Sequence, residues 1–264
     1  MFYEPGKTDH GLPYDPFKAC VIPRPIGWIS TVSPPHASQP PIYNLAPYSQ
    51  FNNLTFDPPY VMFSANQTIA ATATPTDGFN RKDTVHNAES TGYFCWQLAT
   101  YPLREAVNAS AESVPYGVDE FDRAGLEKEW SRCLPVKIPL VKDSPVKFEC
   151  QLHTTLRLPA NPPWGTVDIV IGRVIGVHIN DRYLNADGKL DPALTQPIAR
   201  CGYYDYAVVK ETFEMRVPNT SVEQLAGLEG SVKGNRALRE KLEGDTQGEN
   251  GQTKEGETNG EVKT

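Results

Sequence analysis

The sequence has few cysteines and no long apolar run. Its five cysteines form no C-x-x-C pair, so their spacing predicts neither a disulfide framework nor a zinc site. The most apolar stretch, "VDIVIGRVIGVHI", is interrupted by a charge and is too short to span a bilayer as a helix. The first residues, "MFYEPGKTDHG", lack the basic and apolar regions of a signal peptide. We therefore expect a reduced, cytoplasmic protein that holds no metal and crosses no membrane.

Concentrated positive charge and the common catalytic motifs are also missing. The net charge is −7 without a long basic block, which argues against a dedicated nucleic-acid binder. No G-x-G-x-x-G, Walker lysine loop or G-x-S-x-G elbow is present. None of the histidines in ordered regions has a metal-like partner at i+2, i+3 or i+4, and His178 is expected to be packed or hydrogen-bonded rather than a base. These absences leave no conventional catalytic constellation to assign.

What the sequence does contain is proline, with 24 residues, and runs of β-branched and aromatic residues. These predict a mainly β protein, with bulges or corners at Gly172 and Gly176. Because strands do not alternate regularly with helices, a closed barrel with peripheral helices is favoured. Cys20 and Cys95 are expected to be core thiols. The predicted strands are 19–22, 27–33, 59–65, 92–98, 146–157, 165–179 and 203–210, and the predicted helices are 84–91, 102–112 and a short one within 121–130.

Composition changes sharply near Pro218. We expect a folded domain over residues 1–218 and a polar tail over 219–264, which has too few apolar side chains to offset its ordering entropy. A short helix within 221–242 is the one element that the apolar spacing of the tail predicts.

The tetrapeptide "RKDT", residues 81–84, indicates an anion site. Arg81 and Lys82 are cations, and Asp83 is a good N-cap for a helix whose first turn holds Thr84. A helix N-terminus concentrates unpaired N–H donors and partial positive charge, so the segment predicts a phosphate cradle. An ordinary capped helix with a solvated basic pair explains the tetrapeptide equally well.

Two further stretches suggest contacts with a flat ligand. In "NLAPYSQFN", residues 44–52, the proline predicts an irregular backbone with free N–H and C=O groups, followed by short polar side chains. In "ARCGYYDY", residues 199–206, three tyrosines could cover a ring. The alternatives are a turn between two strands for the first stretch and ordinary aromatic packing for the second.

Taken in order, "RPIGWIST", "NLAPYSQFN", "DPPYVMFS", "KDTVHNAESTGYF" and "ARCGYYDY" resemble the flavin reductase-like domain family, with flavoredoxin-type members most similar. The resemblance covers roughly residues 10 to 215. It implies a six-stranded antiparallel Greek-key split barrel with peripheral helices. It also implies FMN as cofactor and a homodimer with the flavin near the subunit boundary.

The resemblance also implies which residues bind the cofactor. "RPIGWIST" would supply a hydroxyl, "NLAPYSQFN" the edge of the ring, and "RKDT" the phosphate pocket. The implied FMN-binding residues are Thr31, Ala46, Pro47, Tyr48, Ser49, Gln50, Asn52, Ser64, Arg81, Lys82 and Thr84.

The functional expectation is an FMN-dependent oxidoreductase that takes hydride from NADH or NADPH. It would pass electrons to a flavin, a partner protein or a small organic acceptor in a specialised pathway. Without a Rossmann unit, the nicotinamide would stack directly on the exposed flavin face. The alternative is a non-enzymatic FMN-binding electron carrier or sensor, whose flavin pocket would have the same sequence.

Overall fold

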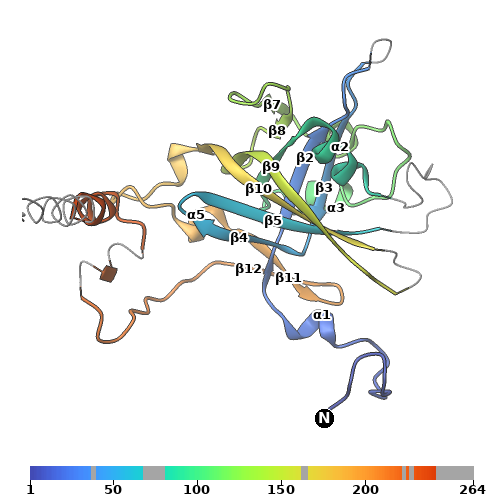
Figure 1. The fold of residues 1–264 in the computed structure, drawn as a ribbon, viewed down its shortest axis with the longest axis horizontal. Coiled ribbons are helices and arrows are strands. Elements are labelled where there is room, and N and C mark those ends of the chain that lie inside the picture. The colour runs from blue at the N-terminus through green and yellow to red at the C-terminus, as the bar shows by residue number, and fades with distance from the viewer. Residues whose placement is uncertain (37–39, 68–80, 162–165, 222–223, 226–228, 242–264) are drawn as a thin grey trace, which may run out of the picture. The chain divides into compact units, whose positions relative to one another are not determined.

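A computed structural model describes residues 1–36, 40–67, 81–161, 166–221, 224–225 and 229–241 (Figure 1). The chain divides into two compact units, Met1–Thr212 and Phe213–Thr264. The first unit holds every strand found among the described residues. Its helices are α1 Phe17–Cys20, α2 Asp83–Thr91, α3 Arg104–Ala109, α4 Glu120–Arg123 and α5 Pro192–Thr195, with a 3-10 turn at Asp181–Tyr183. Its strands are β1 Arg24–Pro25, β2 Gly27–Val32, β3 Tyr43–Tyr48, β4 Phe51–Phe56, β5 Pro59–Asn66, β6 Tyr93–Leu98, β7 Lys128–Trp130, β8 Pro139–Val141, β9 Val146–Leu158, β10 Val167–Ile179, β11 Ile198–Gly202 and β12 Asp205–Val208.

The main sheet has seven antiparallel strands in the order β3-β2-β6-β9-β10-β5-β4. Its two edge strands, β3 and β4, are consecutive in the chain and are joined by only Ser49 and Gln50. The sheet must therefore curl until its edges meet at this turn, where the Ser64 N–H donates to the Gln50 carbonyl at 2.9 Å. The predicted mainly β barrel is confirmed. The expected strand number of six is wrong by one.

Alternation along β10 explains why one face of the long strands fills the barrel. Asp168, Val170 and Val174 are buried, whereas the residues between Asp168 and Val170 and on either side of Val174 are half-buried or exposed. Gly172 and Gly176 lie at the two register shifts against β9, so the predicted bulge positions are confirmed. A Cβ atom on Gly172 would overlap the ring of Phe94, and only glycine lets the strand bend this closely over the core.

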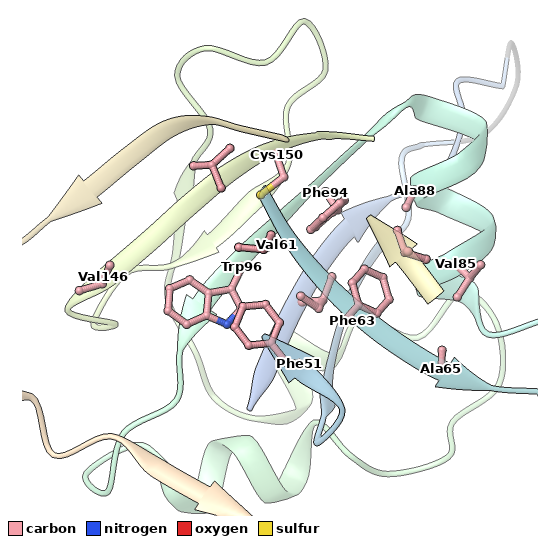
Figure 2. Packing of buried hydrophobic residues seen from close by; sticks show 13 residues of the cluster. Phe51, Val61, Phe63, Ala65, Val85, Ala88, Phe94, Trp96, Val146 and Cys150 are labelled. Atoms are coloured by element: carbon pink, nitrogen blue, oxygen red, sulfur yellow. The ribbon is translucent and has the colours of Figure 1, made fainter. Parts of the chain in front are cut away.

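Aromatic side chains dominate that core (Figure 2). The rings of Phe51 and Trp96 are stacked, with centroids 5.2 Å apart and an interplanar angle of 3°. Phe63 meets Phe94 edge to face at 5.4 Å. Phe51 comes from edge strand β4 and Trp96 from central strand β6, so their stacking closes the barrel across its interior.

Two predicted strands and one predicted core cysteine differ from the structure. The predicted strand 19–22 is wrong, because Phe17–Cys20 forms the short helix α1 and pairing with β11 begins only at Arg24. Cys20 is exposed, with its thiol donating to the Pro16 carbonyl at 3.3 Å, so its assignment to the core is wrong. Cys95 is fully buried, as expected. The predicted strand 203–210 is instead the β11–β12 hairpin, whose turn places Tyr203 at a positive φ of 43°.

The helices follow the sequence more closely. The predicted helix 84–91 is α2, which ends at Gly92 in the left-handed region with φ 80°. The predicted helix 102–112 is confirmed only as the shorter α3, and the expected short helix within 121–130 is α4, which begins one residue earlier. In the second unit, residues 232–241 are helical.

Truncation after residue 220 is expected to leave the melting temperature and the bound-ligand content of the first unit nearly unchanged. None of the described residues from 213 onward is buried, so their removal takes little apolar surface out of contact. Differential scanning fluorimetry of full-length and truncated protein measures this. A fall of several degrees in the truncated protein would show that the tail contributes to the fold.

Candidate functional site

Three segments meet at the turn that closes the barrel. They are the end of β3, the Ser49–Gln50 turn and the start of α2, and we call this region the corner. The Tyr48 side chain lies near Thr84, and the Tyr48 ring packs against Phe63 with centroids 5.0 Å apart. The Gln50 carbonyl is held by Ser64. The structure thus brings Tyr48, Ser49, Gln50, Ser64 and Thr84 together from segments that are separate in the sequence.

Helix α2 directs its first turn toward this corner. Asp83 is the first helical residue, and Lys82 occupies the N-cap position with an extended backbone at φ −66° and ψ 141°. The expectation that Asp83 is the N-cap is therefore wrong by one residue, and the Lys82 side chain makes no capping hydrogen bond. Burial raises the pKa of Asp83, while His86 and Lys82 oppose that rise. The Val85 N–H donates to the Lys82 carbonyl at 2.9 Å, whereas the N–H groups of Asp83 and Thr84 have no acceptor within the helix and can receive an anion.

The two predicted cations of this segment have different roles. Arg81 forms an ion pair with Glu89, two turns along α2. The Lys82 ammonium makes no hydrogen bond or ion pair with any residue in the described part of the chain. Lys82 is therefore the cation of this pair that can accept an anionic ligand.

The two threonines among the predicted ligands lie below the surface. Thr31 is 0% exposed and Thr84 is 1% exposed. Their hydroxyls donate to the same atom, Asn44 Oδ1, at 3.3 and 2.7 Å. Thr31 also accepts from Asn87 Nδ2 at 3.2 Å. Both hydroxyls therefore belong to an internal polar network rather than to an open wall.

Glu120 of α4 completes this network. Its carboxylate accepts from the Leu45 N–H at 3.0 Å and from Asn44 Nδ2 at 3.2 Å. Burial raises the pKa of Glu120, although these hydrogen bonds oppose the rise. The sequence reasoning missed Glu120 and Asn87, because only tertiary packing brings Glu120 to β3 and Asn87 to Thr31 of β2. It also passed over Asn44, whose place in "NLAPYSQFN" was the available signal.

Within residues 44–52 only Ser49 and Gln50 leave the strands β3 and β4, so the prediction of an irregular backbone at the proline is wrong and the alternative of a turn between two strands is confirmed. Pro47 lies within β3, opposite Trp28 of β2. Two residues earlier, the Leu45 N–H points away from β2 toward Glu120. Position 47 has the same orientation in the strand, so an N–H group there would not pair with β2, and proline, which lacks one, is tolerated. Ala46 is half-buried beside it. Asn52 lies on β4 opposite Met62, with its side chain exposed.

The motif "ARCGYYDY" lies in the β11–β12 hairpin and not at the corner. Tyr206 lines a cavity of about 270 Å³ together with Tyr101 and Arg104 of the α3 region. None of the residues lining this cavity is among the predicted flavin ligands. The predicted role of this motif in covering the same ligand is therefore not supported by its position.

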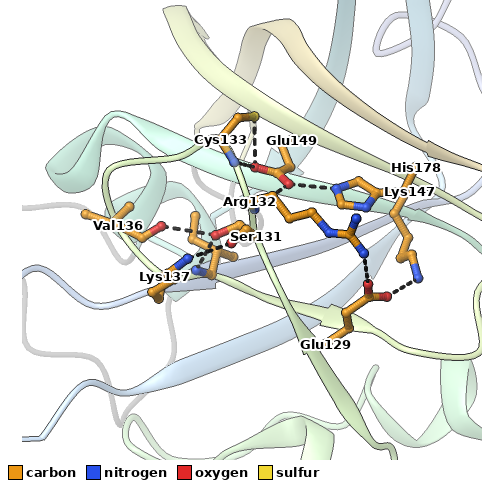
Figure 3. A network of polar contacts seen from close by, with 10 residues as sticks. Glu129, Ser131, Arg132, Cys133, Val136, Lys137, Lys147, Glu149 and His178 are labelled. Carbon is orange, nitrogen blue, oxygen red and sulfur yellow. Dashed lines mark hydrogen bonds and ion pairs between the residues drawn. The ribbon is translucent and has the colours of Figure 1, made fainter.

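A second polar network centres on Glu149 (Figure 3). The buried carboxylate accepts from the N–H groups of Arg132 and Cys133 at 2.7 and 2.9 Å and from the Cys133 thiol at 3.0 Å. His178 Nε2 lies 2.6 Å away, which confirms the expectation of a hydrogen-bonded histidine. Within the described ranges, no group of three or more His, Cys, Asp or Glu side chains could hold a metal ion.

Burial alone would raise the pKa of Glu149, but the hydrogen bonds from Cys133, Arg132 and His178 lower it to about 2. Burial and the neighbouring carboxylate raise the pKa of Cys133 to about 11, so this thiol is neutral. The network therefore joins the β7–β8 turn to the barrel and has no reactive thiolate.

None of the described helices combines the length and apolar character needed to cross a membrane.

Comparison with known proteins gives consistent matches. A family model described as "Flavin reductase like domain" matches residues 19–194. A protein of Aquifex aeolicus is 31% identical over 200 residues, covering 75% of this chain and 91% of its own length. A protein of Bacillus subtilis is 30% identical over 207 residues, covering 78% and 93%. Both relatives are described only as uncharacterised.

Solved structures share the fold. Nitrilotriacetate monooxygenase component B from Bacillus cereus aligns with a TM-score of 0.68 and 26% identity, covering 81% of this chain and 98% of that one. A protein with a split barrel domain from Shewanella frigidimarina aligns at 0.55 with 19% identity, covering 73% and 86%. Flavoredoxin of Desulfovibrio vulgaris aligns at 0.58 with 15% identity, covering 83% and 99%. The structures from Shewanella frigidimarina and Desulfovibrio vulgaris are less than 25% identical to this chain, so their similarity concerns the split-barrel fold alone.

Proposed function

Because the chain belongs to the flavin reductase-like domain family, we propose that it is an FMN-dependent oxidoreductase that takes hydride from NADH or NADPH. When bound, FMN supplies the redox chemistry, and the protein supplies binding and orientation. The single observation that carries this proposal is the convergence of three separately predicted segments at the corner. Strand β3, which leads into the Ser49–Gln50 turn, is joined to the start of α2 by the hydrogen bond from the Thr84 hydroxyl to Asn44 Oδ1 at 2.7 Å.

The residues of the corner fit the parts of this cofactor. Lys82 and the first-turn N–H groups of α2 would hold the phosphate, since a cation and unpaired donors both favour an anion. Ser49, Gln50 and Asn52 have short polar side chains that would meet the ribityl chain and the ring edge, with Ser64 on the neighbouring strand. Ala46, Pro47 and Tyr48 would form the wall.

Three predicted ligands take modified roles in this proposal. The hydroxyls of Thr31 and Thr84 both donate to Asn44, so these residues would support the wall from below. Thr84 would still offer its backbone N–H to the phosphate. Arg81, through its ion pair with Glu89, would hold the start of α2 in place.

Hydride transfer needs no acid or base from the protein, which suits a corner without a catalytic triad. The sequence has no Rossmann motif, so the nicotinamide would stack on the open face of the flavin. The acceptor would be a flavin, a partner protein or a small organic molecule. The 26% identical structure is named as component B of a monooxygenase, which supports a partner enzyme.

A homodimer is part of the proposal. At one end of β10, the outward residues Ile175, Val177 and Ile179 are 41%, 56% and 45% exposed. At the other end of β10, the exposed Leu156 and Leu158 of β9 lie opposite Ile169 and Val167. Exposed aliphatic groups of this kind suit contact with a second copy of the chain. The five cysteines are free thiols, in keeping with the proposed cytoplasmic location.

The test begins with the absorbance spectrum of the purified protein, reconstituted with FMN if it is colourless. Anaerobic addition of NADH or NADPH to the FMN-bound protein is expected to bleach the flavin band with at least one of the two donors. Bound flavin that neither donor bleaches would instead identify an electron carrier or sensor. A colourless protein that FMN cannot restore would contradict both.

A further inference from the structure

The cavity of about 270 Å³ beside the β11–β12 hairpin shares no residue with the predicted flavin site, and we call it the hairpin cavity. Its floor is aliphatic, because Val107 and Ile198 line it and are buried. The half-buried Val208 and the exposed Tyr101 and Tyr206 line it as well. A concave surface with an apolar floor and aromatic side chains is typical of a small-molecule site.

Main-chain hydrogen bonds hold the two sides of the hairpin cavity together. The Ile198 N–H donates to the Ala99 carbonyl at 3.0 Å. The Tyr101 N–H donates to the Gln196 carbonyl at 2.9 Å. These bonds join the segment before α3 to the segment that leads into β11. Because the backbone ties the two sides, the cavity is formed before any ligand binds, and binding needs little ordering of the protein.

Three cations lie at the hairpin cavity or against its aromatic rings, although the whole chain has a net charge of −7. The Arg104 guanidinium lies 4.2 Å from the Tyr101 ring centroid, and the Lys210 ammonium lies 5.8 Å from the same centroid. The Arg200 guanidinium lies 4.6 Å from the ring centroid of Tyr206. This local positive charge favours an anion in the cavity.

Arg104 lines the cavity itself and has donors to offer. Its Nη1 donates to the Tyr101 carbonyl at 2.9 Å, and its Nε lies 3.4 Å from a carboxylate oxygen of Glu105. Among the described residues, none accepts a hydrogen bond from Arg104 Nη2, so both N–H groups of this nitrogen are available to a ligand. Glu105 is exposed, and solvent screens its repulsion of an incoming anion. Its charge still favours a ligand with one negative charge over a dianionic phosphate.

We propose that the hairpin cavity binds a small aromatic carboxylate, with the carboxylate on Arg104 and the ring against Tyr101 and Tyr206. Charge-assisted hydrogen bonds from a guanidinium suit the two oxygens of a carboxylate. Tyrosine rings attract another aromatic ring beyond the apolar area that is buried. Because ligand pockets measure roughly 300–1,000 Å³, a cavity of about 270 Å³ suits a molecule with a single ring. The cavity contains none of the predicted flavin ligands, so this binding needs no flavin.

The test titrates benzoate into the full-length protein by isothermal titration calorimetry, with benzamide as a probe of similar shape and no charge. We expect benzoate to bind at one site per chain and benzamide to bind about tenfold more weakly or worse, because it loses the charge-assisted hydrogen bonds. Cyclohexanecarboxylate keeps the charge without the aromatic ring and is expected to bind about twofold to tenfold more weakly than benzoate. No saturable benzoate binding, or equal affinity of benzoate with either of the other two probes, would overturn the proposal.

Two variants locate the bound benzoate. Arg104→Gln is expected to weaken benzoate binding about tenfold or more and to leave benzamide binding within about twofold. Arg123→Gln is the matched control, because Arg123 also forms a surface ion pair and is 46% exposed against 45% for Arg104, and it is expected to change neither constant. Asn108→Phe fills the cavity from an exposed position on α3, so benzoate binding is expected to be lost while the melting temperature is nearly unchanged. Unchanged benzoate affinity in Arg104→Gln or in Asn108→Phe would overturn the placement.

Repeating the benzoate titration with saturating FMN separates the hairpin cavity from the corner. The dissociation constant of benzoate is expected to stay within about twofold, because the two sites share no residue. Competition between benzoate and FMN, or benzoate binding that requires FMN, would place benzoate at the flavin and overturn the proposal. A protein that binds no FMN would contradict the proposed function instead, while the titrations without FMN would still decide whether the hairpin cavity binds the carboxylate.

Discussion

Replacing Glu149 by alanine is expected to lower the free energy of unfolding by about 3–5 kcal/mol, the range for removing one member of a buried, hydrogen-bonded charged group. The substitution leaves the N–H groups of Arg132 and Cys133 without their acceptor. It also removes the partner of His178. Urea denaturation followed by circular dichroism measures the change. We expect the midpoint urea concentration to fall while the slope of the unfolding free energy against urea stays similar.

The control for this prediction is Glu127→Ala. Glu127 pairs with Lys142 on the surface, and both side chains are more than half exposed, so its loss is expected to change the free energy of unfolding far less than the loss of Glu149. Equal effects of the two substitutions would contradict the anchoring role of Glu149.

The pH dependence of stability provides a second measurement on the same residue. The pKa of Glu149 in the folded protein is about 2, below its ordinary value of 4.5. The folded state therefore binds the proton less readily than the unfolded state. Glu149 contributes stability above about pH 4.5 that is lost as pH falls toward 2. Glu149→Gln is expected to flatten the acid limb of the stability curve, and an unchanged acid limb would contradict this assignment.

The architecture of the barrel could be predicted because the sequence patterns that indicate it extend over only a few neighbouring residues. Alternation in β9 and β10, glycine at the bulges and Gly92 at the end of α2 all follow from backbone chemistry over a few residues. The strand 19–22 was predicted wrongly, because a β-branched segment forms a strand only where a partner is available. Pairing with β11 begins at Arg24.

The candidate site was predictable only in part for a related reason. The motifs indicated which segments contribute, and the structure brings Tyr48, Thr84 and the Ser49–Gln50 turn together. Glu120 could not be found from the sequence, because it reaches β3 through packing of α4 some 75 residues away in the chain. Burial of the Thr31 and Thr84 hydroxyls likewise depends on which residues cover them.

Replacing Lys82 by alanine is expected to weaken FMN binding by about tenfold or more. A charge-assisted hydrogen bond contributes about 1.5–3 kcal/mol when well placed, and about 1.4 kcal/mol corresponds to one decade in the dissociation constant. Arg81 is engaged with Glu89 and is not expected to compensate. Lys189→Ala, in an exposed loop, makes the same change in net charge and is expected to leave FMN binding unchanged.

The most direct test of the account compares FMN with riboflavin in one pair of titrations of wild-type and Lys82→Ala protein. Riboflavin has the same ring and ribityl chain but no phosphate. If the corner binds the flavin with Lys82 on its phosphate, Lys82→Ala raises the dissociation constant of FMN about tenfold or more and leaves that of riboflavin within about twofold. Equal weakening of both ligands, or no change in either, would contradict the placement of the phosphate at the start of α2.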